Sequence, residues 1–384
     1  MRSGFAGLLW FVASCGGGGG GNPDAASHAD AMRDGALPDA PFCPALQVID
    51  PAASTEVVFA GDAPAMGVFD PSIIYPADAP GGAMAYSAVP TQETIRTHVA
   101  LSPDHGATWT YVAELNMPEP MTIASSECTG GVCTGNLISE VTSLIIDPAE
   151  PDPAKRWKLF AHRYLVGPNV ALHYAIGTIT IQTAAQPQGP WTAPQKLIGW
   201  NGSATYSSTG VALNITTAGG TAHDCVALTE PGALVLPGSI DLAVGCVYLD
   251  GATPKIRIEL LRSTDHAATW SSAGTLLRAD DAACSGLAPG LNGPDLFVAN
   301  GTEYVTVTPS DATGYRGCMV FALDTAGHVE RDAEDRAIVS RAFAANQFSG
   351  ACTFADGAGG YAMDIGFLTD PRVFRIFKAG IVGP

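Results

Sequence analysis

Short runs of β-forming residues recur along this chain in groups of four, with Gly, Pro, Asn and Asp between them. No long segment shows the 3.6-residue periodicity of an amphipathic helix. The chain is therefore predicted to be all-β and to contain five units of about four strands each. The first unit comprises Val68–Tyr75, Met84–Val89, Thr97–Leu101 and Tyr111–Leu115, and the others begin near Val141, Cys225, Asp295 and Cys352.

Two eight-residue segments repeat each other. Ser102–Trp109 reads Ser-Pro-Asp-His-Gly-Ala-Thr-Trp, and Ser263–Trp270 reads Ser-Thr-Asp-His-Ala-Ala-Thr-Trp. Short Ser and Asp side chains can bond nearby backbone N–H groups in a tight turn, and a tryptophan can bury a large apolar surface beneath it. Both segments resemble the Asp-box of sialidases and related propellers, the second departing from it at Ala267. The resemblance implies peripheral turns, in which Asp104 and Asp265 have structural roles.

Repeated four-stranded units together with these turns predict a β-propeller, in which each unit is one blade. Five blades are expected, and a six-bladed ring with one irregular blade is the alternative. The fifth unit lacks a clear outer strand, whereas Thr55–Ala60 reads as a strand without a blade. We therefore expect this N-terminal strand to close the ring and leave no open sheet edge.

The N-terminus shows the pattern of a bacterial export signal. Arg2 precedes an apolar stretch from Phe5 to Val12 that is too short to span a bilayer. The residues Val12-Ala13-Ser14-Cys15 resemble the lipobox of bacterial lipoproteins, in which the cysteine is acylated. Residues 1–14 are therefore expected to be a lipoprotein signal peptide and Cys15 the lipidation site, with an ordinary cleaved signal as the alternative.

In residues 15–42, Cys15 is followed by an unbroken glycine run, Gly16 to Gly21. The rest of this segment is rich in Ala, Asp and Pro. Such a segment cannot pack and is predicted to be a flexible tether. Residues 43–384 contain no second polar linker and are predicted to be one propeller domain. The protein is thus expected to be exported and anchored through its acylated N-terminus, at the outer membrane or cell surface.

Apart from Cys15 the chain has eight cysteines, an even number that indicates disulfides in an exported protein. Cys128 and Cys133 bracket a turn-prone Thr-Gly-Gly-Val loop and are the first predicted pair. Cys225 and Cys246 are the second, because they are expected on neighbouring strands. No metal site is predicted, since a structural zinc site uses two close ligand pairs and this chain has one.

The net charge is −18, and only 19 residues are Lys or Arg. This composition argues against nucleic acids as partners, because their phosphates need basic side chains. We expect a monomer.

Catalytic candidates follow from the propeller geometry. The innermost strand of each blade lines the central channel, so polar residues at the start of these strands converge at one mouth. Asp70, Glu140, Asp224 and Asp295 lie at or just before the first strand of their units. Aspartates in such positions also occur as ordinary turn residues.

The segment Phe69-Asp70-Pro71-Ser72-Ile73-Ile74-Tyr75, with Gly189-Pro190-Trp191-Thr192, resembles the five-bladed glycosidases of the arabinanase, xylosidase and levansucrase type, similar to glycoside hydrolase family 43. This resemblance implies that Asp70 is the general base or nucleophile, and the residue before a proline is held extended. The general acid of that family stands in a Glu-Gly-Pro segment, where this chain reads Asn292-Gly293-Pro294-Asp295. Asp295 or Glu140 is then expected to supply the acid, and Asp224 the carboxylate that tunes it.

The predicted function is glycoside hydrolysis on a carbohydrate substrate of the arabinose, xylose or fructose type, by carboxylate acid–base catalysis. Tyr75, Tyr86 and Tyr164 are candidates for stacking on sugar rings. A glycan- or protein-binding propeller without catalysis is the alternative. A sialidase-like enzyme is a second alternative, although the Arg-Ile-Pro segment of that chemistry is absent. No cofactor is predicted, and a structural cation in the channel is left open.

Overall fold

The structure is a computed structural model, which describes residues 44, 46–49, 53–77, 79–218, 220–282, 290–311, 314–344, 348–355, 360–365 and 373–381. The predicted signal peptide, Cys15 and the predicted tether lie outside the described residues, as do Cys43 and Cys284.

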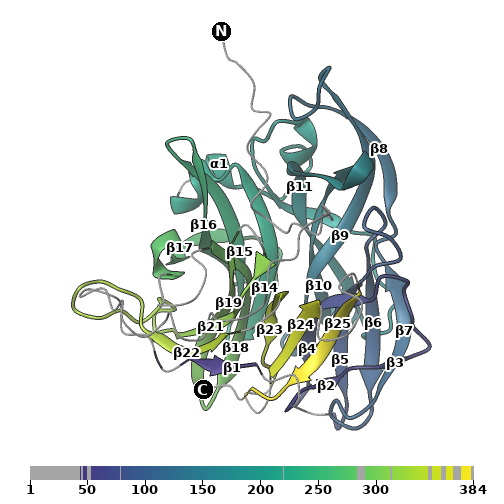
Figure 1. The fold of residues 1–384 in the computed structure, drawn as a ribbon, viewed down its shortest axis with the longest axis vertical. Coiled ribbons are helices and arrows are strands. Elements are labelled where there is room, and N and C mark those ends of the chain that lie inside the picture. The colour runs from purple at the N-terminus through teal and green to yellow at the C-terminus, as the bar shows by residue number, and fades with distance from the viewer. Residues whose placement is uncertain are drawn as a thin grey trace, which may run out of the picture.

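Five antiparallel sheets form the five blades of a β-propeller, as predicted, rather than six (Figure 1). Blade I contains β4 (Val68–Ile74), β5 (Gly82–Ala88), β6 (Arg96–Ser102) and β7 (Trp109–Leu115). Blade II contains β9 (Val132–Ile146), β10 (Trp157–Gly167), β11 (Ala171–Ala184) and β12 (Gln195–Gly199), extended by β8 (Glu119–Ala124) and β13 (Leu213–Asn214). Blade III contains β14 (Ala227–Leu236), β15 (Ser239–Asp250), β16 (Thr253–Ser263) and β17 (Ser271–Leu277).

Blade IV contains β18 (Gly290–Ala299), β19 (Thr302–Asp311), β21 (Gly317–Ala322) and β22 (Val339–Ala344), with β20 (Gly314–Tyr315) and the N-terminal β1 (Gln47–Val48) at its margins. Blade V contains β23 (Phe348–Thr353), β24 (Gly360–Ile365) and β25 (Phe374–Ala379). Helical segments among the described residues are short: α1 (Ile215–Ala218) and the 3-10 turns Pro153–Lys155, Pro168–Val170, Thr205–Ser207, Thr221–Asp224 and Ala279–Ala282.

The N-terminal segment closes the ring, as predicted. β2 (Thr55–Glu56) pairs antiparallel with β25 and is the outer strand of blade V. Three residues further on, β3 (Phe59–Ala60) pairs parallel with β7 at the outer edge of blade I. One short segment therefore joins the last blade to the first.

Each blade carries the same irregularity in its innermost strand. The register shifts by a bulge in β4, β9, β14, β18 and β23. In each bulge one residue has φ near 50°, a conformation rare for residues other than glycine. These residues are Asp70, Val141, Glu230, Gly293 and Ala351. A bulge redirects the side chains around it. Because every blade has a bulge at the same place, the residues at the bulges determine which side chains lie near the centre of the ring.

Side chains just past the bulges join neighbouring blades. The Ser72 hydroxyl accepts a hydrogen bond from the Leu144 N–H of blade II at 2.9 Å, and the Ser143 hydroxyl accepts one from Ala233 N–H of blade III at 2.8 Å. The equivalent residue in blade III is Gly232, where a Cβ atom would lie 2.2 Å from the carbonyl oxygen of Pro294. Blades III and IV therefore approach too closely for any side chain there.

The two repeated segments form matching turns between the third and fourth strands of blades I and III. In each turn the serine hydroxyl and the aspartate carboxylate accept backbone N–H groups, and the tryptophan is buried. The bonds are Gly106 N to Ser102 Oγ (2.7 Å) and Thr108 N to Asp104 Oδ1 (2.8 Å) in the first turn, and Ala267 N to Ser263 Oγ (2.9 Å) and Thr269 N to Asp265 Oδ1 (2.8 Å) in the second.

The structure also explains why the second turn has alanine where the first has glycine. A Cβ atom on Gly106 would lie 2.3 Å from the Tyr75 hydroxyl and 2.4 Å from the Tyr361 hydroxyl of blade V. Ala267 has a similar positive φ, 72°, and is accommodated in the core of blades II and III.

Two predicted strands are placed differently in the structure. The first strand of blade III is β14, which continues through Pro231, whereas the prediction placed it at Cys225 to Leu228. Proline is tolerated there because it lies in the bulge, where the ladder does not need its N–H. The outer strand of blade IV is β22, whereas the predicted strand at Val329 makes an isolated bridge with Leu323 in the excursion that precedes β22.

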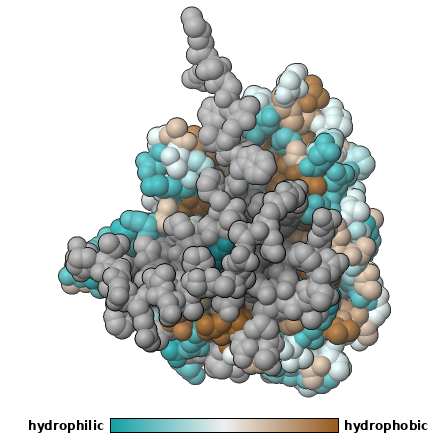
Figure 2. Space-filling view, in the orientation of Figure 1, coloured by the Kyte–Doolittle hydropathy of each residue, from teal (hydrophilic) through white to brown (hydrophobic). Residues whose placement is uncertain are grey.

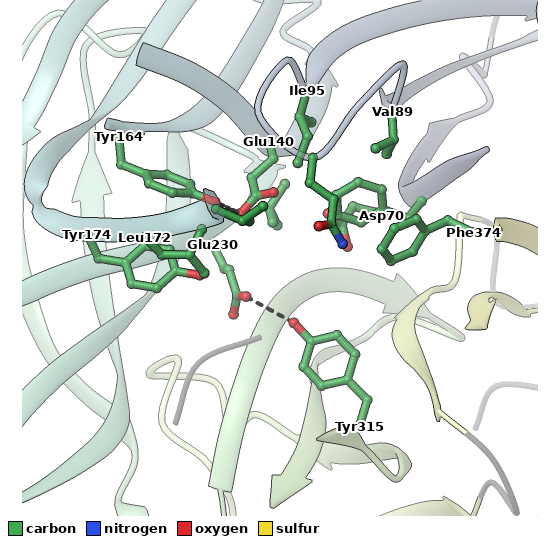
Figure 3. Close-up of a pocket in the computed structure, with 14 residues that line it drawn as sticks. Asp70, Val89, Ile95, Glu140, Tyr164, Leu172, Tyr174, Glu230, Tyr315 and Phe374 are labelled. Atoms are coloured by element: carbon green, nitrogen blue, oxygen red, sulfur yellow. Dashed lines mark hydrogen bonds between the residues drawn. The ribbon is translucent and has the colours of Figure 1, made fainter. Parts of the chain in front are cut away.

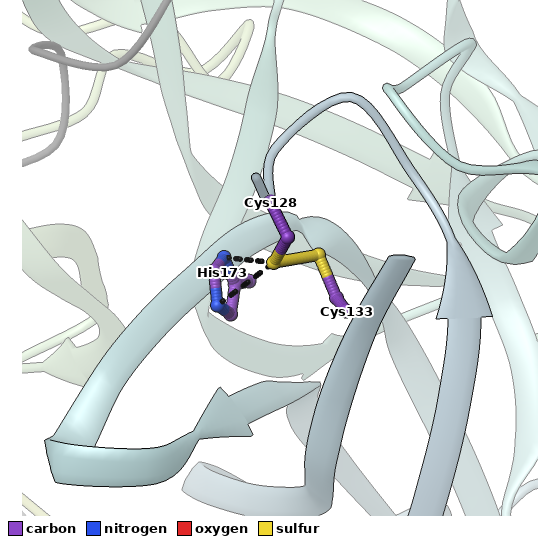
Figure 4. Close-up of side chains that lie close together, drawn as sticks. All are labelled: Cys128, Cys133 and His173. Atoms are coloured by element: carbon purple, nitrogen blue, oxygen red, sulfur yellow. Dashed lines mark hydrogen bonds between the residues drawn. A yellow bond between two sulfur atoms is a disulfide. The ribbon is translucent and has the colours of Figure 1, made fainter. Parts of the chain in front are cut away.

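Both predicted disulfides are present. Cys128–Cys133 lies in the β8–β9 hairpin, where the Sγ atom of Cys128 is 3.6 Å from Nε2 of His173 on β11 (Figure 4). Cys225–Cys246 joins the start of blade III to β15. A third disulfide, Cys318–Cys352, connects β21 of blade IV with β23 of blade V and was not predicted.

In the part of the chain that the structure describes, no helix is long and apolar enough to cross a bilayer. Figure 2 shows hydrophilic and hydrophobic residues intermixed along the described rim of one face of the propeller.

Candidate active site

A pocket lies where the innermost strands of blades I, II and III meet, and it encloses about 570 Å³ including its open mouth (Figure 3). Its polar lining consists of Asp70, Gln92, Glu140, Tyr164, Tyr174, Glu230 and Tyr315. Its apolar lining consists of Phe69, Val89, Ile95, Val141, Val170, Leu172 and Phe374.

Three buried carboxyl groups enter this pocket from three consecutive blades. Asp70 comes from blade I, Glu140 from blade II and Glu230 from blade III, and each is at most 8% exposed. Figure 3 shows the three carboxyl groups pointing into the same cavity. Asp70 and Glu230 occupy the same place in their blades, because each is the positive-φ residue of its bulge and each precedes a proline.

Hydrogen bonds hold each carboxyl group in place. The Ser87 hydroxyl donates to Asp70 Oδ2 at 3.5 Å, and the same hydroxyl accepts Val141 N–H at 3.1 Å. The Tyr164 hydroxyl donates to Glu140 Oε1 at 2.6 Å.

Glu230 is held from blade IV. Gly293 N–H donates to its Oε2 atom at 2.5 Å, and the Tyr315 hydroxyl donates to its Oε1 atom at 3.4 Å. The segment Asn292-Gly293-Pro294-Asp295, predicted to stand where the family has its acid, thus contributes a backbone donor to a carboxyl group of the neighbouring blade.

Burial raises the pKa of all three carboxyl groups, because a dry environment disfavours the charged form. The pKa of Glu140 rises to about 7, with the Tyr164 hydrogen bond opposing the effect of burial. Burial and then the nearby negative charges of Glu140 and Glu230 raise the pKa of Asp70 well above its usual value. The pKa of Glu230 is raised by burial and is pulled back by its two hydrogen bonds. Raised pKa values keep carboxyl groups protonated to higher pH than exposed ones, which is a condition for acid–base catalysis.

The structure brings together Asp70 and Glu140 of the four predicted catalytic residues. Asp295 does not line this pocket, but it lines a second, smaller cavity along the channel that Asp70 lines as well. Burial raises its pKa to about 7. Asp224 is exposed on a 3-10 turn outside the pocket and is ion-paired with Arg257. Asp224 is outside the pocket because the innermost strand of blade III, β14, begins only at Ala227.

Glu230 was missed by the sequence analysis, although a signal for it was present. Glu230-Pro231-Gly232 repeats the pattern of an acidic residue before a proline in the first strand of a unit, as in Asp70-Pro71-Ser72.

Of the three predicted sugar-stacking tyrosines, the structure places Tyr164 at the pocket. Tyr86 is fully buried in the core of blade I, where its hydroxyl donates to Asp62 at 2.7 Å. Tyr75 stacks on His105 and its hydroxyl lies 3.1 Å from that of Tyr361.

Behind the pocket, His162 is buried and stacks on Tyr164 with ring centroids 4.6 Å apart. Burial lowers the pKa of His162 to about 3.

Three groups of potential metal ligands occur among the described residues, and none lines the pocket. Two of them include cysteines that are joined in disulfides. The third, formed by Asp147, Glu150 and His266, already contains a cation, since the Lys158 ammonium group lies 2.8 Å from Glu150 and 3.8 Å from Asp147.

The fold places this chain among the five-bladed propellers found in several glycoside hydrolase families. The sequence matches no protein-family model, and it matches no curated protein. A family 117 glycoside hydrolase of the marine bacterium Zobellia galactanivorans has a TM-score of 0.52 at 10% identity, covering 86% of this chain and 90% of that one.

A family 32 glycoside hydrolase of Bifidobacterium adolescentis has a TM-score of 0.51 at 12% identity, covering 83% of this chain and 56% of that one. An arabinanase of Bacillus subtilis has a TM-score of 0.50 at 12% identity, covering 83% of this chain and 96% of that one. At these identities the similarity establishes the shared fold.

Proposed function

We propose that this protein hydrolyses glycosidic bonds of a neutral glycan by acid–base catalysis between carboxyl groups. The observation that carries the proposal is the convergence of Asp70, Glu140 and Glu230 in one pocket. Glycoside hydrolysis needs one carboxyl group that is protonated and one that is ionised, on opposite sides of the scissile bond. Three buried carboxyl groups whose pKa values are raised to different extents can supply both states.

The roles follow from the positions of the three acids. Asp70 and Glu230 come from equivalent bulges of blades I and III, with blade II between them, so they face the pocket from two sides. Asp70 is the base or nucleophile, in agreement with the resemblance of its Asp-Pro segment to the glycosidases. Glu230 is the general acid that protonates the leaving oxygen. Glu140, held by Tyr164 on the intervening blade, tunes the protonation of both.

A neutral substrate is favoured over an acidic one. Among the described residues that line the pocket there is no Lys, Arg or His. The carboxylate of a sialic acid would therefore meet three acidic side chains and no cation, which disfavours the sialidase alternative.

The chemical assay is hydrolysis of chromogenic arabinofuranosides, xylosides and fructans by the mature chain. We expect Asp70→Asn and Glu230→Gln to lower kcat by about 10² to 10⁴ on an unactivated glycoside, the usual size of an acid or base contribution. The matched control is Asp280→Asn, which changes an exposed aspartate outside the pocket and should leave kcat unchanged.

A second substrate separates the two roles. A dinitrophenolate leaving group needs no proton, so Glu230→Gln should recover most of its activity on a dinitrophenyl glycoside while Asp70→Asn should not. Absence of turnover on every glycoside, or wild-type turnover by Asp70→Asn, would refute the proposal.

We also propose that the protein is exported and held at the membrane through an acylated Cys15, as the N-terminal sequence predicts. The three disulfides among the described cysteines support an oxidising compartment. Fatty-acid labelling of the full chain in a bacterial host should be lost in Cys15→Ala, and labelling that persists would contradict it.

A further inference from the structure

The pocket has more apolar surface than the proposed reaction requires. Besides Val141 at the bulge of blade II, six apolar side chains line the pocket around the carboxyl groups, and they come from blades I, II and V and from the loop between β5 and β6. They are Phe69, Val89, Ile95, Val170, Leu172 and Phe374. Phe69 and Phe374 stack on each other with ring centroids 4.8 Å apart, which gives one side of the pocket a continuous apolar wall.

The described lining offers few hydrogen-bond donors to sugar hydroxyl groups. The Tyr164 and Tyr315 hydroxyls already donate to Glu140 and Glu230, and the third lining hydroxyl, that of Tyr174, is hydrogen-bonded with Tyr164. Among the described lining residues, Gln92 supplies the single side-chain amide, and no basic side chain is present. A hydroxyl group that enters the apolar part of this pocket gives up its bonds to water without replacement, at a cost of about 1 to 3 kcal/mol.

Val170 in the apolar wall has an unusual backbone. It ends the turn Pro168–Val170 between β10 and β11, with φ of 59°, next to Asn169 with φ of 58°. A β-branched residue rarely adopts positive φ, because its branched side chain crowds the backbone. Glycine or asparagine would relieve that strain. Strain of this kind tends to persist at functional sites, which indicates that the pocket needs an apolar side chain at this position.

We propose that the pocket selects a terminal sugar with an apolar edge, namely a deoxy or O-methylated hexose, over its fully hydroxylated counterpart, and that Val170 is a specificity-determining residue. The proposal rests on the proposed function, since it concerns the substrate of the same site. A methyl group in place of a hydroxymethyl group would lie against the apolar wall, while the remaining hydroxyls face the carboxyl groups.

The test measures binding rather than turnover. The full mature chain carrying Asp70→Asn is titrated with matched pairs of methyl glycosides that differ only at C6. In each pair both sugars have the same anomeric configuration and belong to the same enantiomeric series: D- and L-fucoside against D- and L-galactoside, and D- and L-rhamnoside against D- and L-mannoside. Ligand-observed NMR and calorimetry give the affinities. We expect one deoxy member to bind at least about tenfold more tightly than its partner, the range that one group contributes in an apolar pocket.

Val170→Thr has nearly the same shape and adds a hydroxyl group, so it should reduce that preference several-fold. Val112→Thr, at a partly exposed position of β7 outside the pocket, is the matched control and should leave it unchanged. Equal or tighter binding of the hydroxylated member in both pairs would overturn the inference, and so would an unchanged preference in Val170→Thr. Failure of every glycoside to bind at millimolar concentration would also count against it.

The outcomes for the two proposals are separable. Hydrolysis of fully hydroxylated glycosides that depends on Asp70, without deoxy preference, would support the proposed function and refute this inference. Selective binding of a deoxy sugar, with no hydrolysis of its glycosides by the wild-type chain, would support this inference and refute the proposed function.

Discussion

Asp70 and Glu230 point into the pocket because each has a backbone conformation that L-residues rarely adopt. The residue that follows each of them is a proline, which has no N–H to leave unpaired in the bulge. The same position in the other three blades holds Val141, Gly293 and Ala351, none of which can ionise. The acidic character of the pocket therefore depends on the residue type that stands at an otherwise repeated position.

Asp295 provides a test of how buried acids affect stability. Its pKa of about 7 in the folded protein lies above the usual 3.8, so the folded state binds the proton more tightly than the unfolded state. The free energy of unfolding should then fall as the pH rises from about 4 to about 7, and level off above that.

Asn cannot ionise, so Asp295→Asn should remove this part of the pH dependence. We expect it to raise the free energy of unfolding at pH 8 by about 1 to 3 kcal/mol, less than the full shift would give, because Asp295 keeps some exposure. At pH 4 the effect should be small. Urea unfolding at both pH values measures this. Equal effects at the two pH values would contradict a raised pKa in the folded state.

At the scale of elements, the two repeated turns perform the same local task in different surroundings. Both cap a hairpin with Ser and Asp, but the first turn packs against Tyr75 and Tyr361 and the second does not. The first turn therefore also connects blade I with blade V.

This difference predicts opposite tolerance at the two equivalent positions. Gly106→Ala should destabilise the protein by about 1 to 3 kcal/mol, because the new methyl group overlaps two tyrosine hydroxyls and the residue has positive φ. Ala267→Gly, the matched exchange, should change stability by less than about 1 kcal/mol. Thermal unfolding of both variants measures these changes in stability. A Gly106→Ala protein as stable as the wild type would show that the contact with the two tyrosines does not exclude a side chain at this position.

The elements also show what the sequence could predict. The β-rich runs, the first blade and the closing strand at Thr55 were predicted from local patterns, as were the positions of Asp70 and Glu140. Glu230 was missed because Pro231 reads as the end of a strand unless the bulge is known. The pairing of Cys318 with Cys352 depends on which blades are neighbours in space, and local sequence carries no such information.

At the scale of the whole molecule, the ring depends on a segment of a few residues. β2 supplies the outer strand of blade V, and β3 attaches the same segment to blade I. Without them, the outer edges of β25 and β7 would be free to pair with other chains.

Two truncations test this closure. A chain that begins at residue 62 lacks β2 and β3, and we expect its melting temperature to fall by at least about 5 °C, with increased aggregation. A chain that begins at residue 53 lacks β1, as the shorter chain does, but keeps β2 and β3, and it is the control. Differential scanning fluorimetry and light scattering report the two effects. Identical melting of the two truncated chains would mean that the ring does not need this segment.

The Cys318–Cys352 bridge has a consequence for recovery from damage at this seam. It ties β21 to β23 covalently, whereas β2 is held to blade V from the other side by backbone hydrogen bonds and the ion pair between Glu56 and Arg375. If heat or a protease releases β2, the bridge still holds β23 beside blade IV, so blade V loses less conformational freedom when β2 pairs with it again. The bridge therefore favours the return of the last blade to its place in the ring.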